Sequence, residues 1–176
     1  MNLLHDIEPG TEDAMNVIIE TPRGSHNKYE IDKKTGLIKL DRANYNAAPY
    51  PFEYGFVPRT HWDDGDALDV MVLSTFPLYP GILITVRPVA FMEMTDSGDP
   101  DSKIIGVPVD DRRWDDVQDL KDITTHSLKE YKHFFETLKQ LKEKPAVVTV
   151  HGFKGKEEAK AAFRKSLELY KKESSK

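Results

Sequence analysis

The order of the secondary-structure patterns restricts the fold of this chain more than any other feature of its sequence. Segments typical of β-strands extend from Asn16 to beyond Ile104, whereas apolar residues at helical spacing first appear after Ser127. Strands grouped ahead of the helices favour an antiparallel sheet or barrel over an alternating α/β fold. The 176 residues suffice for one hydrophobic core. We therefore predict a single domain, residues 1–176, of mainly β or α+β class.

The predicted strands combine β-branched or alternating residues with turn residues at their ends. They comprise residues 16–21, 27–32, 37–42, 70–73, 82–94, a segment starting near 104, and 147–153. The pattern leaves open whether residues 82–94 form one long strand or two short strands divided near Pro88.

Residues 45–58 are rich in proline and aromatic residues. Proline excludes a helix in this segment and favours a stiff, extended path. We expect Phe52 and Phe56 to pack in the core. Tyr50 and Tyr54 carry hydroxyl groups that need a partner, so each could serve either the core or a functional site.

Two amphipathic helices are predicted near the end of the sequence. Ser127 and Glu130 form a capping-box pattern that would open the first helix, and Pro145 would end it. Its apolar residues, at three- and four-residue spacing, are Tyr131, Phe134, Phe135, Leu138 and Leu141. The second helix is predicted over residues 156–172, and the side chains expected to face inward are Ala159, Ala162, Phe163, Ser166, Leu167 and Tyr170.

The composition restricts the partners of the protein. The net charge of -5 argues against a general nucleic-acid or anionic-membrane binder, which would carry a basic excess. The sequence has no cysteine, so it offers neither a disulfide framework nor a zinc-thiolate site. The first residues do not resemble a secretory signal, and the apolar window 81–86 is too short to span a bilayer. We expect a cytoplasmic protein with no nucleic-acid or membrane partner.

An acidic segment, residues 64–69, places Asp64, Asp66 and Asp69 within six positions. Carboxylates this close repel one another, so in a folded cleft their ionised form requires a cation or a proton. A hard divalent cation such as Mg²⁺ suits ligand sets made of oxygen alone. The segment differs from an EF-hand, and the competing interpretation is an Asp-Gly turn with solvated carboxylates.

Two further polar groups belong to the candidate site. A second acidic cluster, residues 96–103, lies between two predicted strands and could converge with the first at one edge of a barrel. A strand face carries charges of both signs at Glu20, Lys28, Glu30 and Arg42. Such a face is often an exposed set of weak ion pairs. It would also suit a phosphate-rich ligand, which requires carboxylates for metal ions together with Lys and Arg for phosphate oxygens.

These elements occur together and in order, and the ensemble resembles the first family of soluble inorganic pyrophosphatases, the Mg²⁺-dependent cytosolic type, in its prokaryotic form. The matching segments are Glu20 in Ile-Glu-Thr-Pro, Lys28-Tyr-Glu30-Ile-Asp, Asp41-Arg42, Tyr50-Pro-Phe-Glu-Tyr54-Gly-Phe, Asp64-Gly-Asp66-Ala-Leu-Asp69-Val, and Asp96 with Asp101-Ser-Lys103. The resemblance covers essentially the whole chain. It implies Mg²⁺-dependent hydrolysis of pyrophosphate to two orthophosphates. It also implies a closed five-stranded barrel of the oligonucleotide-binding type, with extra strands and two flanking helices.

The resemblance further implies a role for each matching position. Asp66 would be the general base. The residues that would hold several Mg²⁺ ions, or Mn²⁺ or Zn²⁺ in their place, are Asp64, Asp69, Asp96, Asp101, Glu20 and Glu30. The residues that would bind the substrate are Lys28, Arg42, Tyr54, Lys103 and Lys139, and Lys103 would also balance the carboxylates. The implied partners are pyrophosphate and further copies of this chain, in a homo-oligomer expected to be a hexamer.

Two positions depart from the family pattern. Ala67 stands where the acidic motif usually has Pro or Glu, and we expect little effect at this turn-shaping position. Leu138 precedes Lys139 where the family often presents Tyr, and a leucine side chain donates no hydrogen bond. Either Tyr54 and the cations suffice for phosphate binding, or another hydroxyl reaches the site.

Three alternatives compete with pyrophosphate hydrolysis. Another two-metal phosphohydrolase, acting on a nucleotide or polyphosphate, would share the acidic site and differ in the substrates it turns over. An oligonucleotide-binding barrel without catalysis would present a basic, aromatic groove, and the acidic clusters disfavour it. A purely structural member of the family is disfavoured because the acidic residues and Lys103 are all in place.

Overall fold

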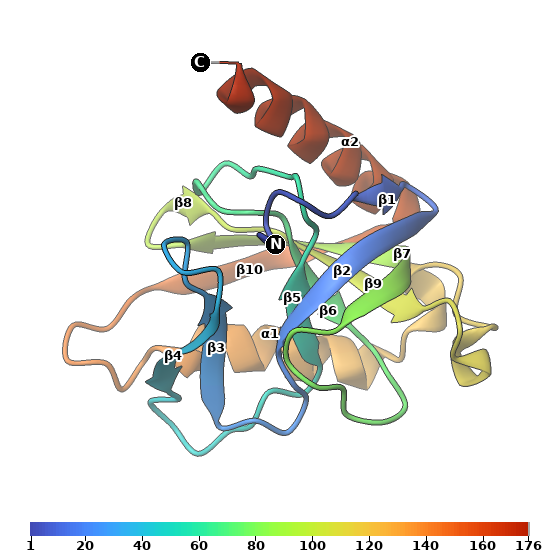
Figure 1. Ribbon diagram of the computed structural model, residues 1–176. Coiled ribbons are helices and arrows are strands. Elements are labelled where there is room, and N and C mark those ends of the chain that lie inside the picture. The colour runs from blue at the N-terminus through green and yellow to red at the C-terminus, as the bar shows by residue number, and fades with distance from the viewer. Residues whose placement is uncertain (176) are drawn as a thin grey trace.

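Five strands pair with one another in a ring at the centre of the computed structural model, which describes residues 1–175 (Figure 1). The strands are β1 (Gly10–Thr11), β2 (Ala14–Thr21), β3 (Asn27–Ile31), β4 (Ile38–Ala43), β5 (Glu53–Phe56), β6 (Asp69–Val72), β7 (Leu83–Asp96), β8 (Asp99–Pro100), β9 (Lys103–Pro108) and β10 (Val148–Gly155). The α-helices are α1 (Thr125–Leu138) and α2 (Lys156–Ser174), and two 3-10 helices occupy Arg112–Trp114 and Leu120–Asp122.

The ring follows the order β2, β5, β6, β9 and β7, and β7 then pairs with β2 again. All of these pairings are antiparallel except that of β6 with β9, which is parallel. Strands β1, β8 and β10 extend the sheet beyond the ring. The predicted five-stranded arrangement with extra strands and two C-terminal helices is thereby confirmed.

Strand β7 continues through Pro88, so the segment predicted over residues 82–94 forms one long strand, which begins at Leu83. Pro88 pairs with Gly106 of β9, and the register shifts before Ala90 pairs with Ile105. Proline has no N–H to donate to the ladder, and such an irregularity is where a sheet tolerates it. Because β7 is 14 residues long, it pairs with four other strands and ends at Asp96, the first residue of the second acidic cluster.

The two helices cover different parts of the core. Phe52, fully buried, packs its ring 5.5 Å from those of Tyr131 and Phe135 of α1. Phe163 of α2 belongs to a second buried cluster with residues of β2, β6 and β7. In Figure 1, α1 crosses behind the strands and α2 lies at the opposite end of the ring, at the top of the view. Phe56 is also buried, which confirms the predicted core position of both phenylalanines.

No helix within residues 1–175 combines the length and the apolar character needed to cross a membrane.

The predicted ends of the first helix were wrong. Helix α1 begins at Thr125, because the hydroxyl of Thr124 accepts a hydrogen bond from the backbone N–H of Ser127 at 3.2 Å and caps the helix. It ends at Leu138, well before Pro145, and Leu141 is exposed instead of packed on the sheet. The end at Leu138 lets the following residue turn toward β7 and the acidic cluster.

The hairpin of β3 and β4 forms a separate two-stranded sheet beside the ring (Figure 1). Strand β3 is held by hydrogen bonds in both directions between the backbone of Tyr29 and the hydroxyl of Thr21 of β2, at 3.1 and 3.0 Å. The carboxylate of Glu20 accepts a further bond from the N–H of Ile31 at 2.8 Å. Ile31 also packs against Ile18 of β2. Strand β3 is therefore anchored to β2 as far as Ile31, the last residue before the turn to β4.

Gly55 of β5 lies too close to β2 for any larger residue. A Cβ atom at this position would stand 2.1 Å from the carbonyl oxygen of Ile18, so Gly55→Ala would force the two strands apart. We expect this variant to lose about 1–3 kcal/mol of unfolding free energy. Gly152 of β10 is a matched control, because a Cβ atom there meets nothing within 4 Å. Urea unfolding should separate the two variants, and equal transition midpoints would contradict the argument.

Candidate active site

One cavity of about 720 Å³ gathers all of the side chains that the sequence analysis named as catalytic, substrate-binding or metal-binding. They are Glu20, Lys28, Glu30, Arg42, Tyr54, Asp64, Asp66, Asp69, Asp96, Asp101, Lys103 and Lys139. Strands β2 to β7 and β9, the two acidic segments and the end of α1 all contribute. The two acidic clusters therefore converge, as the sequence allowed without requiring it.

The buried ammonium group of Lys103 is the centre of this arrangement. Its Nζ donates to Asp69 Oδ2 at 2.7 Å and also contacts Asp101. The hydroxyl of Tyr54 donates to the same oxygen of Asp69 at 2.5 Å. Burial by itself would lower the pKa of Lys103, but the charges of Asp69 and Asp101 outweigh burial and raise it. Lys103 therefore stays protonated and joins the two acidic clusters.

The carboxyl groups around Lys103 are more numerous than its single charge can balance. Burial raises the pKa of Asp101 to about 7, and the nearby carboxylate of Asp69 adds to this effect. Burial likewise raises the pKa of Glu20 to about 8, although the N–H of Ile31 bonds to it. Both carboxyl groups hold their proton more tightly than usual because burial disfavours the ionised form, and the nearby lysines Lys103 and Lys28 offset that effect only in part.

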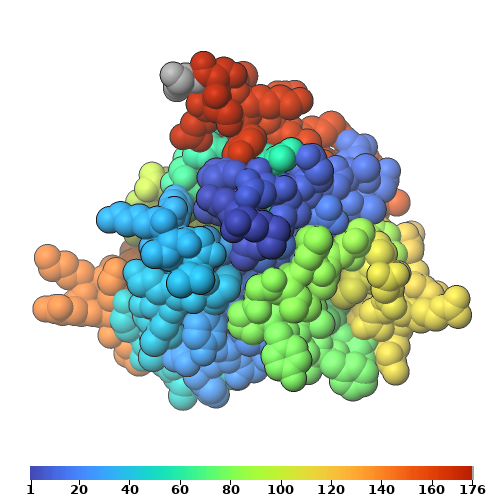
Figure 2. All heavy atoms as spheres, viewed as in Figure 1, coloured from blue at the N-terminus to red at the C-terminus, as the bar shows by residue number. Residues whose placement is uncertain are grey.

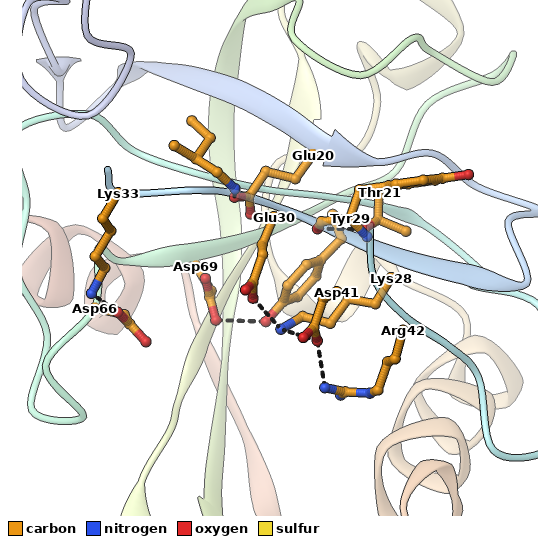
Figure 3. A network of polar contacts seen from close by, with 12 residues as sticks. Glu20, Thr21, Lys28, Tyr29, Glu30, Lys33, Asp41, Arg42, Asp66 and Asp69 are labelled. Atoms are coloured by element: carbon orange, nitrogen blue, oxygen red, sulfur yellow. Dashed lines mark hydrogen bonds and ion pairs between the residues drawn. The ribbon is translucent and has the colours of Figure 1, made fainter. Parts of the chain in front are cut away.

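Lys28 and Arg42 are further cations of the cavity lining. Lys28 Nζ lies 3.2 Å from Glu30 Oε2 and 3.5 Å from Asp41 Oδ2, and Arg42 Nη1 donates to that oxygen of Asp41 at 2.6 Å (Figure 3). These four residues belong to the β3–β4 hairpin. They place two cationic groups side by side, which suits recognition of phosphate oxygens.

Lys139, directly after α1, reaches across the cavity to contact Asp96 at the end of β7. Burial by itself would raise the pKa of Asp96, but the hydrogen bond and charge of Lys139 lower it. Leu138, the residue before Lys139, is buried and lines the same wall. The cavity wall is therefore apolar at Leu138, where the family often presents a tyrosine.

Asp66 lies at the mouth of the cavity and is held by its own loop. Its backbone N–H donates to Asp64 Oδ1 at 3.0 Å, and its carbonyl accepts from the N–H of Trp62 at 2.7 Å. Its carboxylate Oδ1 accepts a bond of 2.5 Å from Nζ of Lys33, in the turn between β3 and β4. The Asp66 side chain is 61% exposed, so it has access to water.

The charged lining suits a hard divalent cation, because carboxylate oxygens are the ligands such ions prefer. Added positive charge would also let the carboxyl groups with raised pKa, Glu20 and Asp101, ionise. Within residues 1–175, no group of three acidic or histidine side chains already converges as a complete ligand set. The Lys103 ammonium lies between Asp69 and Asp101 and contacts both.

Sequence reasoning did not assign a role to several charged or polar residues that line the cavity or contact its cations, among them Tyr50, Asp41 and Lys33. Tyr50 lines the cavity, and burial raises the pKa of its hydroxyl to about 12. Asp41 is the shared partner of Lys28 and Arg42. Tyr50 and Asp41 both lie in segments that matched the family, and this match could have indicated that they belong to the site. Lys33 had no such signal, because a lysine in a hairpin turn is ordinarily solvated.

Comparison with known proteins identifies the family. The family described as "Inorganic pyrophosphatase" matches residues 17–171 of this chain. The chain belongs to the inorganic pyrophosphatase family. An inorganic pyrophosphatase of Picrophilus torridus is 43% identical over 174 residues, which cover 98% of this chain and 97% of that protein. Soluble inorganic pyrophosphatase 1 of Arabidopsis thaliana is 44% identical over 168 residues, covering 94% of this chain and 78% of that protein.

A solved structure extends the similarity to three dimensions. The inorganic pyrophosphatase from Thermus thermophilus superposes with a TM-score of 0.93 at 42% sequence identity, covering 97% of this chain and 99% of that one. The resemblance drawn from the sequence is thereby confirmed. The relatives are named as pyrophosphatases, which are hydrolases that act on diphosphate.

Replacing Lys103 tests its central position. Lys103→Met would leave Asp69 and Asp101 partly buried without their cation, so we expect a loss of about 3–5 kcal/mol of unfolding free energy at neutral pH. Lys154→Met is the matched control, because Lys154 is half exposed and lies 4.0 Å from its partner Glu93. Chemical denaturation measures both variants, and a Lys103→Met protein as stable as the control would refute the central role.

Proposed function

We propose that this protein hydrolyses inorganic pyrophosphate to two orthophosphates in a reaction that depends on Mg²⁺. The observation that carries the proposal is the single cavity in which acidic residues and cationic residues face one another. A pyrophosphatase needs both, since the substrate is a polyanion and the metal ions need anionic ligands. Membership of the family supports the same reaction.

The proposed metal ligands are carboxylates of both acidic segments. Asp64, Asp69 and Asp101 would hold the activating ions, and Asp96 would join Asp101 at ions that arrive with the substrate. Glu20 and Glu30 lie in the same cavity and would act as outer ligands or hold water. Bound Mg²⁺ supplies positive charge that lowers the pKa of water and offsets the charge of phosphate oxygens.

The proposed phosphate-binding groups come from separate elements of the fold. Lys28 and Arg42 project from the hairpin, and Lys139 follows α1. Tyr54 brings a hydroxyl from β5, and Lys103 offsets the charge of the neighbouring carboxylates. In phosphoryl transfer most of the rate enhancement comes from positioning and electrostatics, so cations held by a rigid frame suit the reaction.

Asp66 is the proposed general base. A water oxygen attacks one phosphorus atom, the bond from that phosphorus to the bridging oxygen breaks, and the bridging oxygen leaves with the second phosphate. The proton of the attacking water passes to a carboxylate oxygen of Asp66. The hydrogen bonds of the Asp66 backbone to Asp64 and Trp62 fix the position of the residue in its loop, and the exposure of its side chain gives water access.

Further properties implied by the family resemblance remain predictions. They are self-association into a homohexamer, a cytoplasmic location, the extent of the single domain over residues 1–176, and replacement of Mg²⁺ by Mn²⁺ or Zn²⁺. Leu138 lines the cavity, so its effect on phosphate binding is open to measurement.

The direct test is release of orthophosphate from pyrophosphate by the purified protein. We expect rapid release with Mg²⁺ and its loss when a chelator is added, because the carboxylates need bound cations to activate water. Parallel assays with a nucleoside triphosphate and a linear polyphosphate decide the substrate class. Faster turnover of either compound, or no metal-dependent release from pyrophosphate by folded protein, would overturn the proposal.

Asp66→Asn tests the general base. The amide cannot accept the proton, so we expect kcat to fall by about 10²- to 10⁴-fold while the fold and the Mg²⁺ binding measured by calorimetry persist. Asp63→Asn removes a carboxylate from the same loop, but Asp63 pairs with Lys165 and lies outside the cavity lining. This control should keep the normal rate. An unchanged rate for Asp66→Asn would exclude Asp66 as the base.

A further inference from the structure

Lys33 makes the most exposed of the ion pairs that line the cavity. It lies in the turn of the β3–β4 hairpin, and its side chain is 67% exposed. Its ammonium group donates a hydrogen bond to the carboxylate of Asp66, which lies 33 positions later in the sequence. The hairpin forms the blue to cyan projection in Figure 2, to the left of the N-terminal segment. Lys33 is therefore both at the solvent and in the wall of the cavity.

The pair of Lys33 with Asp66 differs in kind from the pair of Lys103 with Asp69. The Lys103 side chain is 2% exposed, and losing its partners would leave a buried charge. An exposed pair is weak, because water solvates both groups when they separate and salt screens their attraction. Lysine also has a long, flexible side chain that can exchange one anionic partner for another at little cost.

The position of Lys33 complements that of the other cations on the same hairpin. In Figure 3, Lys33 and Asp66 lie at one side, Lys28 and Arg42 lie at the other, and Asp69 lies between them. The hydrogen bonds between β2 and β3, the last of them at Ile31, fix the backbone directly before the turn that carries Lys33. A diphosphate has a charged group at each end, so cations at both sides of the cavity suit it better than one cluster.

We propose that Lys33 is a further substrate-binding residue of this site, an inference that rests on the proposed function. When pyrophosphate enters, the ammonium group of Lys33 leaves Asp66 and bonds to a phosphate oxygen. This exchange places a cation at the outer end of the substrate. It also frees the carboxylate of Asp66, which must accept a proton in the reaction. Before substrate arrives, the same ammonium group balances the charge of Asp66.

Binding of imidodiphosphate in the presence of Mg²⁺ tests the exchange without turnover, since nitrogen replaces the bridging oxygen of the substrate. We expect Lys33→Ala to raise the Kd measured by calorimetry, and the KM for pyrophosphate, about fivefold. Lys33→Arg keeps the charge and should restore most of the affinity. Lys39→Ala is the matched control, because Lys39 is an exposed lysine of β4 in the same hairpin and does not line the cavity. It should leave both constants unchanged.

A second background separates direct binding from an effect through Asp66. In Asp66→Asn protein, Lys33→Ala should still weaken imidodiphosphate binding if the lysine contacts phosphate. Loss of the effect in that background, or an unchanged Kd and KM for Lys33→Ala alone, would overturn the proposal. If the unmodified protein does not hydrolyse pyrophosphate, the proposed function fails. The binding comparison still decides whether Lys33 contacts a diphosphate.

Discussion

The buried ion cluster of Lys103 with Asp69 and Asp101 is the interaction on which the arrangement of the cavity depends. Lys103 begins β9, Asp69 begins β6, and Asp101 lies in the connection between β8 and β9. Desolvating these charges is expensive, and each group offsets the cost for the others only while all are in place. Tyr54 adds a bond from β5. The cluster therefore ties three neighbouring strands of the ring at the end where the cavity opens.

The apolar frame makes this cluster possible. Pairing in the ring of β2, β5, β6, β9 and β7 fixes the positions of the strands that carry cavity residues. Aromatic packing of Phe52 on α1 supports the ring from behind. Charges become more exposed from the inside of the cavity outward, from Lys103 through Lys139 to Lys33. Inner groups are thus held rigidly, and outer groups are free to change partners. A site that binds a polyanion and then releases its products needs both.

Particular segments explain why prediction succeeded or failed. The fold class followed from strands preceding helices, a property of local patterns that tertiary contacts rarely reverse. The ends of α1 did not follow, because the hydroxyl that caps the helix belongs to Thr124, one of several residues able to do so. The continuity of β7 through Pro88 depended on a register shift against β9, which no local pattern encodes. Lys33 was missed because its partner Asp66 lies 33 positions away in the sequence.

The amino-acid sequence by itself determined the class of fold, the family and the candidate catalytic, substrate-binding and metal-binding residues. These features follow from the types of the residues and from their order along the chain. Only the tertiary structure decided which carboxylate faces which cation, how deeply each pair is buried and which pKa values shift. Those quantities depend on distances between strands far apart in the sequence and on the water excluded between them. The structure thereby distinguished Lys103, a buried charge, from Lys33, an exposed one.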